Sequence, residues 1–200
     1  MILIVYISAA LVNSLPVHTF SSINSIVEDV FQISQLNVTL NALLFTIAHP
    51  IFAFPWNWVL NKYGIRPGFI AGGVLLIIGV WLRLLLQVGN STYCLIGSAL
   101  AAIGNIFILN TPSKVAINWF SAERVPIVTF TGILSTLISL TVGASVPGFL
   151  IDSHSTPDDI RKFLFIEACV ITVPIVLLII FFKEKPKNPP SKTAKIIFHE

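Results

Sequence analysis

Residues 125–151 read VPIVTFTGILSTLISLTVGASVPGFLI and contain no Asp, Glu, Lys or Arg. A helix needs about 20 mostly apolar residues to cross the hydrocarbon core of a bilayer, so this run is long enough for one span. Three other runs, at 1–27, 30–61 and 84–113, also lack charged residues. Because the apolar runs are continuous rather than alternating, they predict helices and not strands.

The composition of the chain excludes several classes of soluble protein. Hydrophobic residues make up 55% of the 200 positions and charged residues only 10%, whereas a soluble domain carries about 25% charged residues. A soluble enzyme, a disordered chain and a nucleic-acid binder are therefore poor interpretations. We expect the lipid bilayer, and no nucleic acid, as a partner. The net charge of +3 lies in residues 183–200, which hold five Lys against two Glu.

The uncharged runs and the turns between them predict an all-α membrane protein with six transmembrane helices. The expected spans are about 2–26, 37–61, 68–88, 92–112, 125–148 and 162–182. Residues 1–182 are thus expected to form one six-helix transmembrane unit. Residues 183–200 are expected to form a basic cytoplasmic linker or tail.

The positions of Lys and Arg predict the orientation of these helices, because basic residues favour the cytoplasmic side. One set of connections, together with the tail, carries nine basic residues, whereas the opposite set carries only Arg161 and Lys162. We therefore expect a multi-pass protein with both termini in the cytoplasm, in the plasma membrane rather than an organelle. Asn37 and Asn90 begin Asn-x-Thr sequons on the predicted outer side, so both are candidate glycosylation sites.

Polar side chains inside apolar spans are the first candidates for function, because such groups usually face the protein interior or a cavity. At helical spacing, polar and apolar residues together form a stripe on each of the first two spans, for which ordinary helix packing is the alternative interpretation. The stripes are Asn13, Val17, Phe20 and Asn24 on the first span, and Asn41, Phe45 and His49 on the second. His49 is either a ligand contact or a partner for a backbone carbonyl freed by Pro50. The candidate cavity-lining residues from this pattern are Asn13, Val17, His18, Phe20, Phe45, His49 and Asn105.

Two oppositely charged residues also lie within predicted spans. Arg83 is near the outer end of the third span, and Glu167 is a few residues inside the sixth. We expect them to form an ion pair, with Lys162 as the alternative partner of Glu167. Extension of Arg83 to the membrane interface and a role in proton coupling are the other interpretations.

The fifth predicted span is rich in small residues, which permit close approach of helices. They are Gly132, Ser135, Thr136, Ser139, Gly143, Ala144 and Ser145. A helix that moves during alternating access and ordinary tight packing both explain this pattern.

Common enzyme signatures are absent from the sequence. It has no HExxH, GxSxG or phosphate-binding Gly-rich motif, and Cys94 and Cys169 belong to no CxxC or His/Cys cluster. We therefore predict that the chain is not an enzyme, and we expect no catalytic residues, no metal and no cofactor.

Five strings, in order along the chain, resemble the feline leukemia virus subgroup C receptor-related transporters of the major facilitator superfamily. They are Val12-Asn13, FPWNWVLNKYGIR at 54–66, GVWLR at 79–83, FILNTPSK at 107–114 followed by Trp119-Phe120, and KEKPKNPPS at 183–191. The resemblance implies a twelve-span fold of two six-span halves with a substrate cavity between them. It also implies a small organic solute of the choline, ethanolamine or haem type. The chain resembles the amino-terminal half, and we expect it to be part of a longer carrier.

Three positions depart from the family's pattern. In the gating loop after the second span, Gly64 and Arg66 are retained, but Asn61 stands where the superfamily has Asp. Val17 stands where a first-span Trp would attract a quaternary ammonium by a cation–π interaction of ~0.5–2 kcal/mol. Leu137 stands where a fifth-span Gln contacts ligand, and so joins the candidate cavity-lining residues by resemblance. These departures imply either a solute less cationic than choline or a loss of the transport function.

We therefore predict transport of a small organic solute by alternating access, of the facilitator or exporter type. The missing wall of the cavity would come from a carboxy-terminal half or from a second copy of the chain. One alternative is a six-span half-carrier that works as a homodimer. The other is a non-transporting or degenerate membrane fragment or partner subunit.

Overall fold

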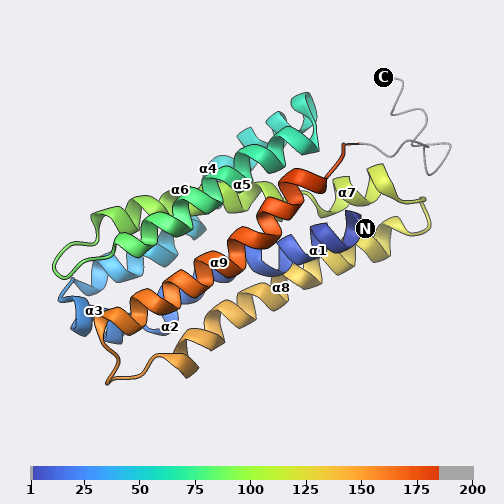
Figure 1. The fold of residues 1–200 in the computed structure, drawn as a ribbon. Helices are drawn as coiled ribbons and strands as arrows, with labels where there is room; N and C mark the ends of the chain where they lie inside the picture. Colours follow the sequence, from blue (N-terminus) through green and yellow to red (C-terminus); the bar gives the residue numbers. More distant parts are fainter. Residues whose placement is uncertain (1, 185–200) are drawn as a thin grey trace.

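A computed structural model of the chain describes residues 2–184, which form a bundle of helices (Figure 1). The elements are α1 (Ile2–Asn13), α2 (Leu15–Ser22), α3 (Asn24–Phe31), α4 (Gln35–Tyr63), α5 (Ile65–Leu82), η1 (Arg83–Leu85), α6 (Thr92–Leu109), α7 (Pro112–Trp119), α8 (Val125–Leu150) and α9 (Pro157–Phe181). Most of the predicted basic tail, residues 185–200, lies outside the described residues.

Six helical segments are long and apolar enough to cross a membrane. They are Ile2–Ser22, Gln35–Tyr63, Ile65–Leu85, Thr92–Trp119, Val125–Leu150 and Pro157–Phe181. No strand is formed between residues 2 and 184. The prediction of an all-α protein with six transmembrane helices is therefore confirmed.

The sixth of these helices begins earlier than the predicted residue 162. Thr156 and Asp159 form a reciprocal cap, in which Asp159 N donates to Thr156 Oγ1 at 3.3 Å and Thr156 N donates to Asp159 Oδ2 at 3.0 Å. Pro157 fits the first turn because the N–H groups at the start of a helix have no acceptor within the helix, so proline loses no hydrogen bond there. The predicted connection at this point thus becomes the first turn of α9.

The fourth span also continues beyond its predicted end at residue 112. A short break at Asn110 and Thr111 is followed by α7, which again begins with a proline, Pro112. The backbone N–H of Asn110 still donates to Ile106 O at 3.1 Å, and Val115 N donates to Thr111 O at 2.9 Å. The two helices therefore form one long segment with a bend between them.

Helices α5 and α6 pack through glycines that are spaced by seven residues on each helix. These are Gly72 and Gly79 on α5, and Gly97 and Gly104 on α6. A Cβ atom on Gly79 would meet Ala101 N and Gly97 O, and one on Gly104 would meet Gly72 O. Only hydrogen at these positions lets the two backbones lie in contact.

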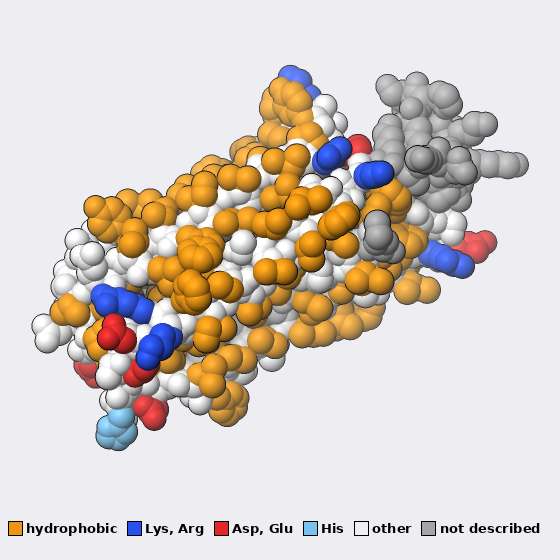
Figure 2. Space-filling view, in the orientation of Figure 1, with side chains coloured by type: hydrophobic (Ala, Val, Ile, Leu, Met, Phe, Trp, Pro, Cys, Tyr) orange, Lys and Arg blue, Asp and Glu red, His pale blue; other side chains and the backbone are white. Residues whose placement is uncertain are grey.

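Hydrophobic side chains cover the length of the bundle, and charged side chains gather at its two ends (Figure 2). Ile2 and the end of α9 lie at the same end of the bundle (Figure 1). An apolar belt between two charged ends is the surface that a bilayer would cover. This arrangement fits an integral, multi-pass membrane protein.

Candidate functional site

The first span is broken midway along its length, where α1 ends at Asn13 and α2 begins at Leu15. In an unbroken helix the N–H of Val17 would donate to Asn13 O, but here it donates to Ser14 O at 3.3 Å. Pro16 has no N–H to donate. The first span, Ile2–Ser22, is therefore two helices with a break between them. The break frees backbone groups at a depth where water cannot satisfy them.

Neighbouring helices satisfy the freed groups. Asn105 on α6 donates from Nδ2 to Asn13 O at 2.9 Å, and Asn13 donates from Nδ2 to Asn105 O at 3.2 Å. The N–H of Ser14 donates to Ser139 Oγ on α8 at 3.1 Å. Asn13, Asn105 and Ser139 are all buried. Two predicted site residues, Asn13 and Asn105, are thus brought into direct contact.

The small-residue face of α8 packs directly on the broken segment. Gly143 touches the backbone of Leu15, and a Cβ atom at this position would meet Leu15 O. Of the small residues predicted to pack, Ala144 and Ser145 are exposed, whereas the rest are buried. Close packing of α8 against the first span is therefore a feature of the structure.

A buried ion pair holds the second part of the broken span. Arg83 Nη1 lies 3.7 Å from Glu167 Oε2, with both side chains buried. Glu167 accepts a hydrogen bond of 2.5 Å from Thr19 Oγ1, and the Arg83 guanidinium lies 4.7 Å from the ring centroid of Phe20. Thr19 and Phe20 both belong to α2. The pair from η1 and α9 therefore fixes α2 against the rest of the bundle.

A second polar cluster joins α4 to α6 through Asn41, a residue of the predicted stripe on the second span. Asn41 Oδ1 accepts from Ser98 Oγ at 2.7 Å and from Cys94 Sγ at 3.4 Å. Asn41 Nδ2 donates to Asn37 O at 2.8 Å. The sequence indicated Asn41 but not its partners, although Ser98 follows Cys94 by one helical turn and the two therefore share one face of α6.

The other predicted cavity residues divide into two groups. Phe20 and Phe45 lie in the packed core, with exposures of 2% and 7%. Val17, His18 and His49 are partly exposed, and Leu137 is 53% exposed on α8. Because this second group lies on the surface of the described bundle, it lines no enclosed cavity within it.

The loop after the second span, which the sequence predicts to act in gating, is held by two contacts from distant parts of the chain. Gly64 has φ +91°, a conformation that glycine adopts without strain. The next two N–H groups, of Ile65 and Arg66, donate to the two carboxylate oxygens of Glu184 at 2.8 and 2.6 Å. Asn61 Oδ1 accepts from Lys114 Nζ at 2.7 Å. Asn61 therefore still links α4 to α7, although it lacks the charge of Asp.

The Glu184 contact was missed by sequence reasoning, although its physical basis is simple. The first N–H groups of a helix have no partner within the helix, and the helix dipole favours an anion there. Glu184 stands directly after the sixth span and supplies that anion to α5. Within residues 2–184, no group of three His, Cys, Asp or Glu side chains is placed to hold a metal ion.

Removing the Asn105 amide tests the bridge at the break. Asn105→Ala is expected to lower the free energy of unfolding by about 1–3 kcal/mol, because Asn13 O would stay buried without a donor. The matched control is Asn110→Ala near the end of the same helix, where Nδ2 has no partner among the described residues. Denaturant unfolding of the purified chain in detergent measures both, and equal losses would contradict the role given to Asn105.

Comparisons with known proteins give one family and a group of related transporters. The model of the Major Facilitator Superfamily matches residues 2–197. The choline/ethanolamine transporter FLVCR2 of Rattus norvegicus is 26% identical over 202 residues, and that of Homo sapiens is 25% identical over the same length. The choline/ethanolamine transporter FLVCR1 of Mus musculus is 26% identical over 214 residues.

Each of these alignments covers 98% of the chain but only 37–38% of the relative. The chain therefore spans less than two fifths of the length of the relatives that it matches. The resemblance found in the five sequence strings is confirmed by these matches.

Proposed function

Because the chain belongs to the Major Facilitator Superfamily, we propose that its six helices form one half of a carrier that moves a small organic solute by alternating access. The observation that carries the proposal is the break in the first span at Ser14, with its backbone groups bonded by Asn105 and Ser139. Broken helices and intramembrane polar groups mark substrate pathways in membrane carriers. A carrier, and not an enzyme, is also what the related proteins are named as.

The substrate cavity of this carrier lies between the described bundle and a second six-helix unit. Support comes from Val17, His49 and Leu137, which are at least partly exposed on three different helices. His49 and Leu137 lie midway along their spans, and Val17 lies just after the break in the first span. A second unit would cover these side chains. It is either a carboxy-terminal half or a second copy of this chain.

The solute is a small organic molecule whose binding depends less on cation–π attraction than the binding of choline does. The relatives are named as choline/ethanolamine transporters, but Val17 and Leu137 offer neither an aromatic face nor an amide at the positions implied by the resemblance. No Asp or Glu lies among the spans' candidate cavity residues, which favours facilitated diffusion over ion coupling.

The proposed orientation places Ile2 and the end of α9 in the cytoplasm, at the plasma membrane. Support comes from the excess of Lys and Arg at that end. Of the two candidate glycosylation sites, Asn90 is the better acceptor. It lies exposed in a turn, with its Oδ1 accepting from Thr92 N at 2.9 Å, whereas Asn37 is held within helix α4.

Uptake into proteoliposomes tests the proposal. The purified chain is expected to move radiolabelled ethanolamine or a neutral analogue of similar size, faster than empty vesicles, once it is assembled with a second six-helix unit. Crosslinking in the same membranes reports whether that unit is a second copy. A chain that is strictly monomeric and moves no solute would favour the non-transporting alternative.

A single substitution tests the inference about the solute. Val17→Trp is expected to tighten choline binding by about 2–30-fold, because an indole would restore ~0.5–2 kcal/mol of cation–π attraction. The control is Val173→Trp, which adds the same ring on the outer face of α9, where Val173 is 60% exposed. Competition of choline against a labelled solute measures both variants. An unchanged choline affinity in V17W would show that residue 17 does not face the solute.

A further inference from the structure

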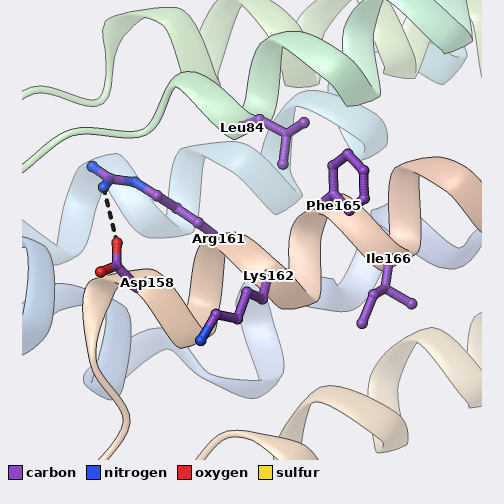
Figure 3. A pocket seen from close by; sticks show the side chains of 6 residues that line it. All are labelled: Leu84, Asp158, Arg161, Lys162, Phe165 and Ile166. Carbon is purple, nitrogen blue, oxygen red and sulfur yellow. Dashed lines mark hydrogen bonds and ion pairs between the residues drawn. The ribbon is translucent and has the colours of Figure 1, made fainter.

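A shallow hollow of about 680 Å³ lies over the first turns of α9, at one end of the bundle (Figure 3). Its polar end is formed by Asp158, Arg161 and Lys162. Its apolar end is formed by Leu84, Phe165 and Ile166. The hollow therefore changes from charged to apolar along the direction of the helix. A ligand that fits the hollow would therefore have a charged part and an apolar part.

The polar end holds two cations, Arg161 and Lys162, and one anion, Asp158, each of which already makes one ion pair. Arg161 is fixed, because Nε and Nη2 donate to Leu86 O at 3.3 and 3.1 Å, and Nη1 lies 3.4 Å from Asp158 Oδ1. The Lys162 side chain is 75% exposed, and its one polar contact within residues 2–184 is 3.4 Å, from Nζ to Asp159 Oδ1. Because an ammonium has three donors, Lys162 keeps donors for a ligand. Asp158 is 79% exposed and keeps one carboxylate oxygen.

The apolar end lies on both sides of α9. Figure 3 shows Leu84 and Phe165 on the side toward η1, and Ile166 on the opposite side. Phe165 packs edge-on against Trp81, with ring centroids 5.7 Å apart, so its side of the hollow has a firm apolar wall. Phe165 and Ile166 are both at least half exposed.

A second hollow of about 200 Å³ adjoins the first and shares Ile166 with it. It lies between α8 and α9, and its rim includes Val142, Val146 and Val170. Its polar residues, Thr19 and Glu167, are already bonded to each other at 2.5 Å. The slot thus has no free polar group to offer, and it suits an apolar chain.

We propose that the two hollows together bind one diacyl phospholipid with a zwitterionic headgroup. The phosphate lies at Lys162, and the ammonium of the headgroup lies at Asp158. One acyl chain enters the slot between α8 and α9, and the other lies along Leu84 and Phe165. A phospholipid fits because the lining residues run from the charged first turn of α9 into its apolar part, where a bilayer would place headgroups and upper chains. Figure 2 shows the same change, from charged side chains at the ends of the bundle to hydrophobic ones along its length.

The site is tested by lipid retention in native mass spectrometry of the purified full chain, titrated in detergent with three lipids of the same acyl chains. These are phosphatidylcholine, phosphatidylglycerol and diacylglycerol. Phosphatidylcholine is expected to bind most tightly and diacylglycerol least. Lys162→Gln is expected to weaken binding of both phospholipids by about fivefold, the effect of one basic residue near a headgroup. Asp158→Asn is expected to weaken phosphatidylcholine alone.

Two matched controls make the test decisive. Lys62→Gln removes a lysine at the opposite end of the bundle and should leave retention unchanged. In the slot, Val146→Phe should reduce retention, whereas Val173→Phe, on the face of α9 outside both hollows, should not. The proposal is overturned if diacylglycerol binds as well as phosphatidylcholine, if phosphatidylglycerol binds more tightly than phosphatidylcholine, or if K162Q behaves as K62Q does.

Discussion

Replacing Arg83 by Met is expected to lower the free energy of unfolding by about 3–5 kcal/mol, the usual effect of removing one partner of a buried ion pair. Arg83 and Glu167 are 1% and 7% exposed. Without the guanidinium, the Glu167 carboxylate would keep the hydroxyl of Thr19 but no compensating charge. Because both residues hold α2, we expect α2 to loosen before the rest of the bundle.

The double variant R83M/E167M separates charge from packing. It is expected to recover most of the lost stability, because well-packed apolar residues commonly replace a buried ion pair without loss. The control is Lys162→Met in lipid-free detergent, since the Lys162–Asp159 pair is exposed and should contribute less than about 1 kcal/mol. Unfolding in denaturant measures all three. If R83M is as stable as K162M, the anchoring role of the Arg83–Glu167 pair is refuted.

Adding side chains between α5 and α6 is the second change with a large expected effect. A Cβ atom on Gly97 would lie 2.6 Å from Gly79 O and 3.0 Å from Arg83 N. These are backbone atoms, so a whole helix must shift. Gly97→Ala is expected to reduce the free energy of unfolding by about 1–3 kcal/mol, the range found for overpacked cores, and Gly97→Leu to leave little folded protein.

Gly148 provides the matched control for that series. It lies in helix α8, and a Cβ atom there would meet nothing within 4 Å. Gly148→Ala should therefore be neutral or stabilise the chain by up to about 1 kcal/mol through helix propensity. Thermal unfolding in the same detergent measures the change in stability of both variants. Changes of opposite sign in G97A and G148A would establish that the close contact at Gly97, and not the loss of a glycine, causes the destabilisation. Equal signs would refute close packing at Gly97.

The number of spans could be predicted from the sequence because bilayer thickness fixes the length of an uncharged run. Helix ends could be predicted less well, since they depend on local bonds such as the Thr156–Asp159 cap. The break at Ser14 had a sequence signal in the nearby Pro16. It was overlooked because the uncharged run continues on both sides of it.

The contacts of the candidate site depend on which face each helix turns toward its neighbours. The spans are apolar on nearly all sides, because lipid covers the outer faces, so hydropathy does not indicate rotation. Asn13 and Asn105 were both singled out, but their mutual hydrogen bonds were not. The glycines at positions 72 and 79, and at 97 and 104, are spaced by seven residues, a pattern that is visible in the sequence. The contact of Glu184 with α5 joins residues that are too far apart in the sequence for a local pattern to indicate it.

The partners of the first span lie far along the chain. Its break and the start of α2 are bonded to groups 92, 125 and 148 residues later in the sequence. A ribosome adds about 5–20 residues per second, so the first span waits on the order of 5–30 s for these groups to be made. During that time Asn13, Ser14 and Thr19 face the surrounding membrane without them. The nascent protein is therefore expected to need shelter at the insertion machinery until α8 and α9 have emerged.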